Sequence, residues 1–259
     1  MMAITAAQAA KQILKTLKAA GRPDRAAQSR VYFKGHEDVR FFGLAVPEAR
    51  AVEREFYAAV KGVWTLADAL TLCDLLIRES ELEAKQIGIE VLAHFKRQFT
   101  PDLLQTFKGW LADDHCGNWA TTDALCSLAL SPLLLKHPAL IAELKLWTRD
   151  ENLWVRRASA VPLTGPARRG QHLNEAYEIA EALLGHPEDL IHKATGWLLR
   201  DAGRTDPARL EAFLLCHGPR ISRTTLRYAI EKFPEPLRKE YLSRRKFACY
   251  ARMDRSKPF

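Results

Sequence analysis

The sequence predicts an all-α protein in which helix pairs stack into an α-solenoid, curved and with a basic concave face. Apolar residues recur at helical spacing, as in Leu66-Leu70-Cys73-Leu76-Ile77. Proline and glycine breaks divide the chain into helix pairs of about 35 residues, a period typical of HEAT-like repeats. No useful strand alternation is present. An irregular helical bundle with accidental periodicity is the alternative.

Helix boundaries follow in order along the chain. Residues 1–50 should hold N-terminal helices and a connector, in which 36–47 is either a packed linker or a ligand contact. Proline near a first helical turn indicates starts at Thr100-Pro101-Asp102 and His137-Pro138. We therefore predict a single HEAT-like repeat domain over residues 1–259, with a basic tail at about 245–259. Further breaks are expected at Gly165-Pro166, Gly185-His186-Pro187, Asp206-Pro207, Gly218-Pro219 and Phe233-Pro234-Glu235-Pro236.

The net charge of +8 and the pI near 9.3 fit a nucleic acid, an anionic membrane surface or an acidic protein partner. Five cysteines without a CxxC pair indicate reduced thiols and favour the cytoplasm. Polar residues interrupt the first twenty positions, so we expect neither a signal peptide nor a membrane span.

Cations recur at nearly the same position in successive repeats. Lys85 and Arg157 are 72 residues apart, two periods of 36, and Lys193 and Arg227 follow after 36 and 34 residues. Because second helices of stacked pairs line the concave face, these cations should form a stripe that can follow a phosphate backbone. The alternative is that any exposed helix face collects lysine and arginine.

The member missing from this row falls near position 121, where the chain carries Trp119 and Asp123 instead. These two residues are four apart and share one helix face. Trp197 lies in a later second helix. Taken singly, each tryptophan could be core and Asp123 a cap or an ion-pair partner. Together they place a carboxylate and two indoles within a cationic surface, which suits chemistry on a polyanion.

Four blocks of sequence resemble the AlkD-type alkylpurine DNA glycosylases, which are HEAT-like DNA alkylation repair proteins. The resemblance is best over about residues 100–232 and weaker at Phe42-Gly43-(x3)-Pro47-Glu48-(x)-Arg50. The blocks are Asn118-Trp119-(x3)-Asp123, Leu135-Lys136-His137-Pro138, Glu151-Asn152-Leu153-Trp154-Val155-Arg156-Arg157-Ala158 and His192-Lys193-Ala194-Thr195-Gly196-Trp197-Leu198-Leu199-Arg200.

The resemblance implies roles for particular residues. Asp123 would be the catalytic carboxylate, and Trp119 and Trp197 would contact the DNA backbone around the lesion. Arg157 would bind a phosphate. The cations that we expect to contact DNA are Arg157, Arg156, Lys85, Lys193, Arg168, Arg169, Arg223 and Arg227.

The resemblance also implies the reaction. The protein would be a monomeric, monofunctional glycosylase that needs no cofactor or metal. It would hydrolyse the N-glycosidic bond of cationic alkylated purines in double-stranded DNA, such as 3-methyladenine, 7-methylguanine and bulky N3 or N7 adducts. It would lack a base-flipping pocket and act at the bacterial nucleoid. A carboxylate beside the sugar stabilises the positive charge that develops there, and indole faces add cation–π attraction.

Some features depart from this pattern or favour other functions. The turn Gly43-Leu44-Ala45-Val46-Pro47 is apolar where polar residues are expected, and the loop Gly165-Pro166-Ala167-Arg168-Arg169-Gly170 is glycine-rich and basic. Either would alter DNA contacts or lesion preference. His115-Cys116 has no second ligand pair to hold a metal. A non-catalytic binder of bent or branched DNA and a HEAT-like scaffold for an acidic protein remain as alternatives.

Overall fold

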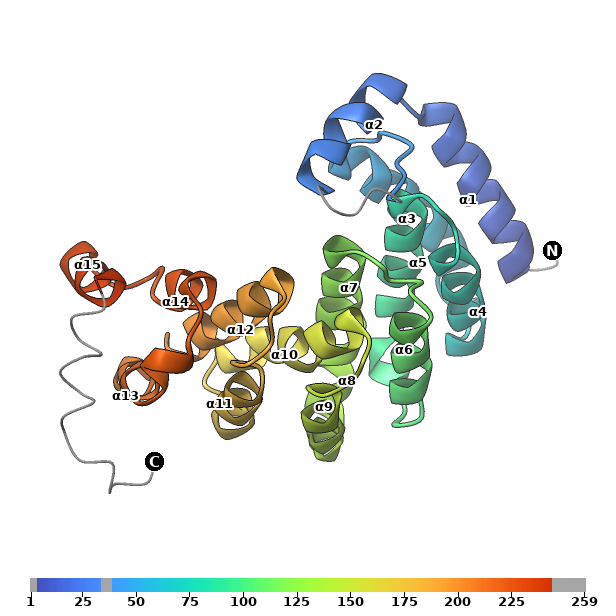
Figure 1. Cartoon of the computed structure of the whole chain (residues 1–259). Coiled ribbons are helices and arrows are strands. Elements are labelled where there is room, and N and C mark those ends of the chain that lie inside the picture. The colour runs from blue at the N-terminus through green and yellow to red at the C-terminus, as the bar shows by residue number, and fades with distance from the viewer. Residues whose placement is uncertain (1–3, 34–38, 244–259) are drawn as a thin grey trace. The chain divides into compact units, whose positions relative to one another are not determined.

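The computed structural model describes residues 4–33 and 39–243 (Figure 1). Every regular element in these ranges is helical, and the β structure there is an isolated bridge between Arg40 and Glu81. The all-α prediction is confirmed, and the stacked helices form an α-solenoid-like fold. The predicted basic tail and part of segment 36–47 lie outside the described residues.

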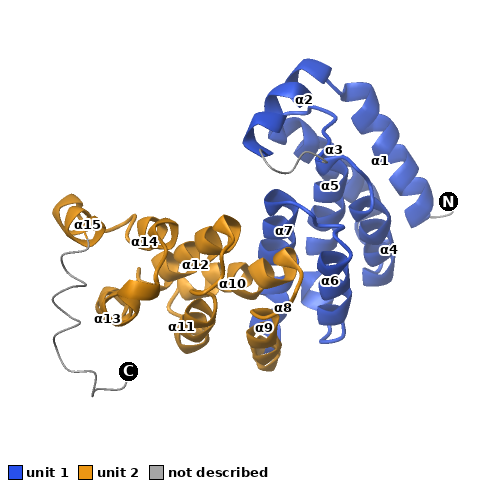
Figure 2. Cartoon of the chain, viewed as in Figure 1, with its two compact units in different colours: residues 1–137 blue, residues 138–259 orange. Residues whose placement is uncertain are grey.

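The chain divides into two compact units, Met1–His137 and Pro138–Phe259 (Figure 2). Each unit is described by itself, and one continuous repeat domain stays a prediction. No single helix in the described ranges is long and apolar enough to cross a membrane; one bent helix pair, Trp119–Lys136 with Pro138–Trp147, meets the criteria of length and composition alone.

Unit 1 stacks its helices in two layers. Helix α4 packs against α1 and α5, and α5 also contacts α3 and α7. The largest buried side chains between them include Leu72, Leu76 and Ile87. The elements are α1 (Ala6–Ala20), α2 (Pro23–Ser29), η1 (Arg30–Phe33), α3 (Val46–Val60), α4 (Leu66–Ile77), α5 (Leu82–Ala93), η2 (Lys96–Gln98), α6 (Leu103–Ala112), α7 (Trp119–Leu125), the π-helical η3 (Cys126–Leu130) and α8 (Ser131–Lys136).

Unit 2 repeats this arrangement. Helices α10, α12 and α14 lie side by side in one layer, and α9 and α11 pack behind them. A Cβ atom on Gly196 would lie 2.5 Å from the Cβ of Tyr228, so this glycine lets α14 approach α12 closely. The elements are η4 (Pro138–Leu140), α9 (Ile141–Trp147), α10 (Leu153–Ala167), α11 (Leu173–Ala182), α12 (Asp189–Ala202), α13 (Pro207–His217), η5 (Gly218–Arg220), α14 (Arg223–Ala229) and α15 (Glu235–Leu242).

One predicted boundary is wrong. Gly165-Pro166 lies inside the last turn of α10, which continues to Ala167 and also contains Pro162. Proline removes one backbone donor, yet α10 is almost wholly buried against α9, α11 and α12 and keeps its helical path. The chain turns instead at Gly170, where φ is +75°. The other predicted breaks all fall between helices or at their first residues.

Candidate functional site

Four second helices carry a predicted site residue at the same position, counted from the first residue of each helix. Asp123 is the fifth residue of α7, counting from Trp119, and Arg157 is the fifth of α10, counting from Leu153. Lys193 and Arg227 hold the same position in α12 and α14, which begin at Asp189 and Arg223. Lys85 is the fourth residue of α5, which begins at Leu82. Asp123 therefore stands where the other helices carry a cation.

Trp119 is the first residue of α7 and lies against an aromatic cluster. Its ring stacks on Phe33 of η1, with centroids 4.9 Å apart and planes inclined by 13°. Phe41 meets Phe33 edge-on at 5.2 Å. These three rings line a cavity of about 330 Å³ in unit 1, together with Leu44 and Val46. The apolar turn noted in the sequence thus forms part of the wall beside Trp119.

Glu83 holds this wall in place. Its buried carboxylate accepts hydrogen bonds from the backbone N–H groups of Phe42, Gly43 and Leu44, at 3.1, 2.8 and 3.1 Å. Gly43 has φ of +87°, and a Cβ atom there would lie 2.1 Å from the carbonyl oxygen of Arg22. The residues around Phe42-Gly43 therefore support the cavity.

Asp123 lies one turn after Trp119 on the same face of α7 and is half-buried. The Asn118 side chain caps this helix by accepting the N–H of Thr121 at 2.9 Å. After Leu125 the helix widens into the π-helical η3, where the N–H of Ser131 donates to the carbonyl oxygen of Cys126, five residues earlier. Pro132 has no N–H to continue the ordinary pattern. Such π-helical segments are rare in proteins, and those that do occur often lie at functional sites.

The ammonium group of Lys85 links neighbouring repeats by hydrogen bonds. Its ammonium donates to the carbonyl oxygens of Ile77 at 2.7 Å and His115 at 2.6 Å. Burial lowers its pKa below the usual lysine range. Lys85 thus joins the end of α4 to the segment that precedes α7.

Arg156 and Arg157 are both buried. The Arg157 Nη1 donates to the carbonyl oxygen of Leu190 in α12 at 2.6 Å. Arg156 forms an ion pair with Glu188 and donates to the carbonyl oxygens of Asp150 and Glu151. In unit 2 these two arginines tie α10 to the start of α12.

Trp197 and Arg168 share one carboxylate. The indole Nε1 of Trp197 donates to Asp201 at 3.0 Å, and the Arg168 Nη2 donates to the same oxygen at 2.7 Å. Asp201 is 1% exposed, whereas the side chain of Arg168 is 47% exposed. Asp201 therefore orients a half-buried indole and a solvent-facing guanidinium together.

The remaining predicted cations differ in their surroundings. Lys193 pairs with Asp189 at 2.8 Å and keeps 40% of its side chain exposed. Arg227 is exposed, as is Arg169, which contacts Gln171. Arg223 donates to the carbonyl oxygen of Leu242 at 3.1 Å and so ties α14 to α15.

The expected stripe of equivalent surface cations is thus wrong in one respect. Lys85 and Arg157 hold carbonyl oxygens of neighbouring elements, whereas Lys193 and Arg227 face solvent. The position of a residue in its helix predicts on which face its side chain lies. Whether the charged group is buried depends on the neighbouring helix. The roles of all these cations in DNA binding stay predictions.

Two groups of predicted residues come together. Unit 1 joins Trp119 and Asp123 on one face of α7, and unit 2 joins Trp197 and Arg168 at Asp201. Sequence reasoning missed Phe33 and Phe41, which lie outside the repeat helices, and Glu83, which lies in α5. It also missed Asp201, although its spacing of four residues from Trp197 was a usable signal.

His115 and Cys116 lie in different surroundings, the first against Arg78 and the second in the core. The Nε2 of His115 lies 2.8 Å from Nη1 of Arg78, and burial raises the pKa of the Cys116 thiol to about 12. No group of three His, Cys, Asp or Glu side chains in residues 4–33 and 39–243 is arranged to hold a metal ion.

Comparison with known proteins assigns this architecture to a family. The family model described as DNA alkylation repair enzyme matches residues 13–233. A solved structure described as a predicted DNA alkylation repair enzyme from Enterococcus faecalis is similar, with a TM-score of 0.72 and 18% identity over 83% of this chain and 97% of that one. The curated proteins contain no match. At this identity the structural likeness bears on the fold alone.

Proposed function

The chain belongs to the family of DNA alkylation repair enzymes, and on that premise we propose that it is a monofunctional DNA glycosylase. Its substrates are cationic alkylated purines in double-stranded DNA, such as 3-methyladenine and 7-methylguanine. The observation that carries the proposal is the position of Asp123. It replaces a cation at the fifth position of a second helix and lies one turn from Trp119.

The chemistry needs a carboxylate and little else. An alkyl group at N3 or N7 makes the purine cationic and therefore a good leaving group. The bond between C1′ and the base nitrogen breaks, and its electron pair neutralises the base. Positive charge then develops on the deoxyribose, where an ionised Asp123 stabilises it. Water adds to C1′ and loses a proton, which leaves an abasic site. None of these steps requires a cofactor.

Aromatic and cationic side chains would hold the DNA during this reaction. Trp119 offers an indole beside Asp123, and Trp197 is oriented by Asp201 next to the exposed guanidinium of Arg168. Cation–π attraction to an indole adds about 0.5–2 kcal/mol, depending on desolvation. The phosphate contacts that we propose in unit 2 use Lys193, Arg168, Arg169 and Arg227.

The cavity beside Trp119 supports bulky adducts as substrates. It measures about 330 Å³, within the size range of small-molecule sites. Four aromatic rings line it, together with Leu44, Val46, Leu82 and Ile87. Its polar lining includes Glu83 and Gln86 and the ion pair between Arg50 and Glu90. The Glu83 carboxylate on its wall already accepts hydrogen bonds from backbone N–H groups of the apolar turn. An apolar group carried by the damaged base fits such a space better than the polar edge of an undamaged base does.

One experiment tests the proposal directly. The full chain is incubated with methylated duplex DNA and with a duplex that carries a bulky N3-adenine adduct, and the released base is identified by mass. We expect free alkylpurine and an abasic strand. Preferred binding of DNA junctions without base release would favour a non-catalytic DNA binder. Absence of DNA binding at low salt would favour a protein scaffold, since phosphate contacts strengthen as salt falls.

A further inference from the structure

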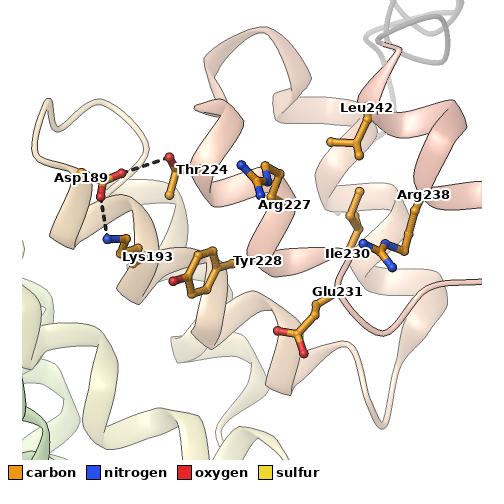
Figure 3. A pocket seen from close by; sticks show the side chains of 9 residues that line it. All are labelled: Asp189, Lys193, Thr224, Arg227, Tyr228, Ile230, Glu231, Arg238 and Leu242. Atoms are coloured by element: carbon orange, nitrogen blue, oxygen red, sulfur yellow. Dashed lines mark hydrogen bonds and ion pairs between the residues drawn. The ribbon is translucent and has the colours of Figure 1, made fainter. Parts of the chain in front are cut away.

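A second cavity, in unit 2, differs in chemistry from the one beside Trp119. It measures about 520 Å³ and lies between α12, α14 and α15 (Figure 3). Its charged lining consists of three cations and two acids. They are Lys193, Arg227, Arg238, Asp189 and Glu231.

Both acids in this cavity are already neutralised by neighbours. Asp189 pairs with Lys193 at 2.8 Å and accepts the Thr224 hydroxyl at 3.0 Å, the two contacts drawn in Figure 3. The hydrogen bond from Lys193 lowers the pKa of Asp189. Glu231 pairs with Lys232 at 2.8 Å and with Arg200 at 2.5 Å, and these hydrogen bonds lower its pKa.

Two guanidinium groups are left over. Arg227 comes from α14 and Arg238 from α15, and both are exposed. Neither guanidinium group has a hydrogen bond or ion pair with another residue in the described ranges. The three cations and two acids of the lining leave a net charge of +1, and since each acid already has a cation, the charge of the two guanidinium groups is available to attract an anion.

The helix that carries Arg238 is held in place rather than left loose. Tyr241 of α15 is 0% exposed, and its hydroxyl donates to Glu211 at 3.3 Å. The Arg223 Nη1 donates to the carbonyl oxygen of Leu242 at 3.1 Å. These contacts anchor α15 to α13 and α14, so Arg238 is presented to the cavity from a fixed helix.

We propose that this cavity binds a backbone phosphodiester of DNA between Arg227 and Arg238. Guanidinium groups suit phosphate because their planar donors match its oxygens in pairs. The cavity has room for a phosphate with its attached sugars, and Tyr228, which is 36% exposed, offers a ring at its edge. The choice of DNA as the source of the phosphate rests on the proposed function. Arg238 is thus a DNA-binding residue beyond those predicted from the sequence.

The test compares Arg238→Gln with Lys239→Gln in the full chain. Both changes remove one positive charge from α15, but Lys239 pairs with Glu235 and does not line the cavity. Affinity for an undamaged duplex with hydroxyl ends is measured as a function of salt. We expect Arg238→Gln to lower the slope of log affinity against log salt by about 0.9, the value for one phosphate contact. Lys239→Gln should keep the wild-type slope, and Arg238→Lys should restore most of it.

The other outcomes separate the hypotheses. An unchanged slope in Arg238→Gln, or equal losses in both variants, would overturn the phosphate site while leaving the proposed function intact. Failure of the wild-type protein to bind any duplex would overturn both. A loss seen only with 5′-phosphorylated duplex ends would assign the cavity to a terminal phosphate and contradict the phosphodiester assignment. The phosphodiester assignment would also be contradicted if millimolar inorganic phosphate competed with DNA, Arg238→Gln abolished this competition and the salt slope of DNA binding stayed unchanged.

Discussion

The two units offer cavities of opposite character. Unit 1 surrounds Trp119 with Phe33 and Phe41 and leaves a largely apolar space. Unit 2 leaves a polar cavity that holds Arg227 and Arg238. The apolar cavity of unit 1 includes rings from outside the repeat helices, whereas the cationic cavity of unit 2 lies between α12, α14 and α15. Under the proposed function, unit 1 would receive the lesion and unit 2 would hold the DNA backbone.

The row of repeat positions shows a similar contrast. Lys85 and Arg157 donate to carbonyl oxygens of neighbouring elements, whereas Lys193 and Arg227 reach solvent. Between α12 and α14 the linking contact comes from Thr225, whose hydroxyl donates to the carbonyl oxygen of His192 at 3.0 Å. Because hydroxyl groups already make that link, Lys193 at the fifth position of α12 is not needed for it; Lys193 pairs with Asp189 and keeps 40% of its side chain exposed.

The largest effect is expected at Asp123 of unit 1, the carboxylate for which we propose the catalytic role. Asp123→Asn keeps the shape of the side chain but removes the negative charge that stabilises the developing sugar cation. We expect the single-turnover rate of base release to fall at least about 100-fold, while affinity for undamaged duplex stays within about twofold. Quenched-flow release of 7-methylguanine and a binding titration measure the two quantities. Wild-type excision by this variant would contradict the mechanism.

The next largest effect tests the wall of the apolar cavity. Gly43→Ala forces a side chain into a backbone conformation with φ of +87° and places its Cβ atom 2.1 Å from a carbonyl oxygen. The conformation alone costs about 1–3 kcal/mol, and the clash adds to it. Gly62→Ala is the matched control, since Gly62 has φ of +79° with nothing within 4 Å. Denaturant unfolding should show a larger loss for Gly43→Ala, and equal losses would contradict the clash.

In unit 2 the buried carboxylate that orients the tryptophan gives an intermediate effect. Asp201→Asn removes the ion pair with Arg168 and weakens the acceptor of the Trp197 indole. We expect a stability loss of about 1–3 kcal/mol and weaker binding of lesion DNA, with a smaller fall in the single-turnover rate than in Asp123→Asn. Glu178→Gln, at an exposed carboxylate of α11 outside the cavity, is the control. A rate loss as large as that of Asp123→Asn would place Asp201 in the chemistry.

The smallest effects compare two cations at nearly the same repeat position. Lys85→Met replaces a half-buried ammonium that donates two hydrogen bonds. We expect a stability loss of about 1–2 kcal/mol. The salt dependence of DNA binding should change little. Lys193→Met should do the reverse, since its ion pair is exposed and contributes little to stability. Thermal unfolding and salt titrations measure both quantities. Matching results for the two variants would restore the view of equivalent cations.

The sequence predicted much of the fold and part of the site. Proline and glycine positions located all but one of the predicted boundaries, because these signals act within a few residues. The exception was Gly165-Pro166, where burial of α10 keeps the helix intact. Trp119 and Asp123 were found because they interrupt a repeat. Phe33 and Phe41 belong to no repeat, so their meeting with Trp119 had no local signal.

By itself, the sequence determined the all-α class, the register of the second helices and the position of a carboxylate among cations. These properties follow from short-range periodicity and from residue type. Tertiary structure decided which of those cations are covered, what surrounds Trp119 and how Asp201 joins Trp197 to Arg168. Burial and hydrogen bonding between helices depend on side chains from distant segments, and no spacing along one helix encodes them.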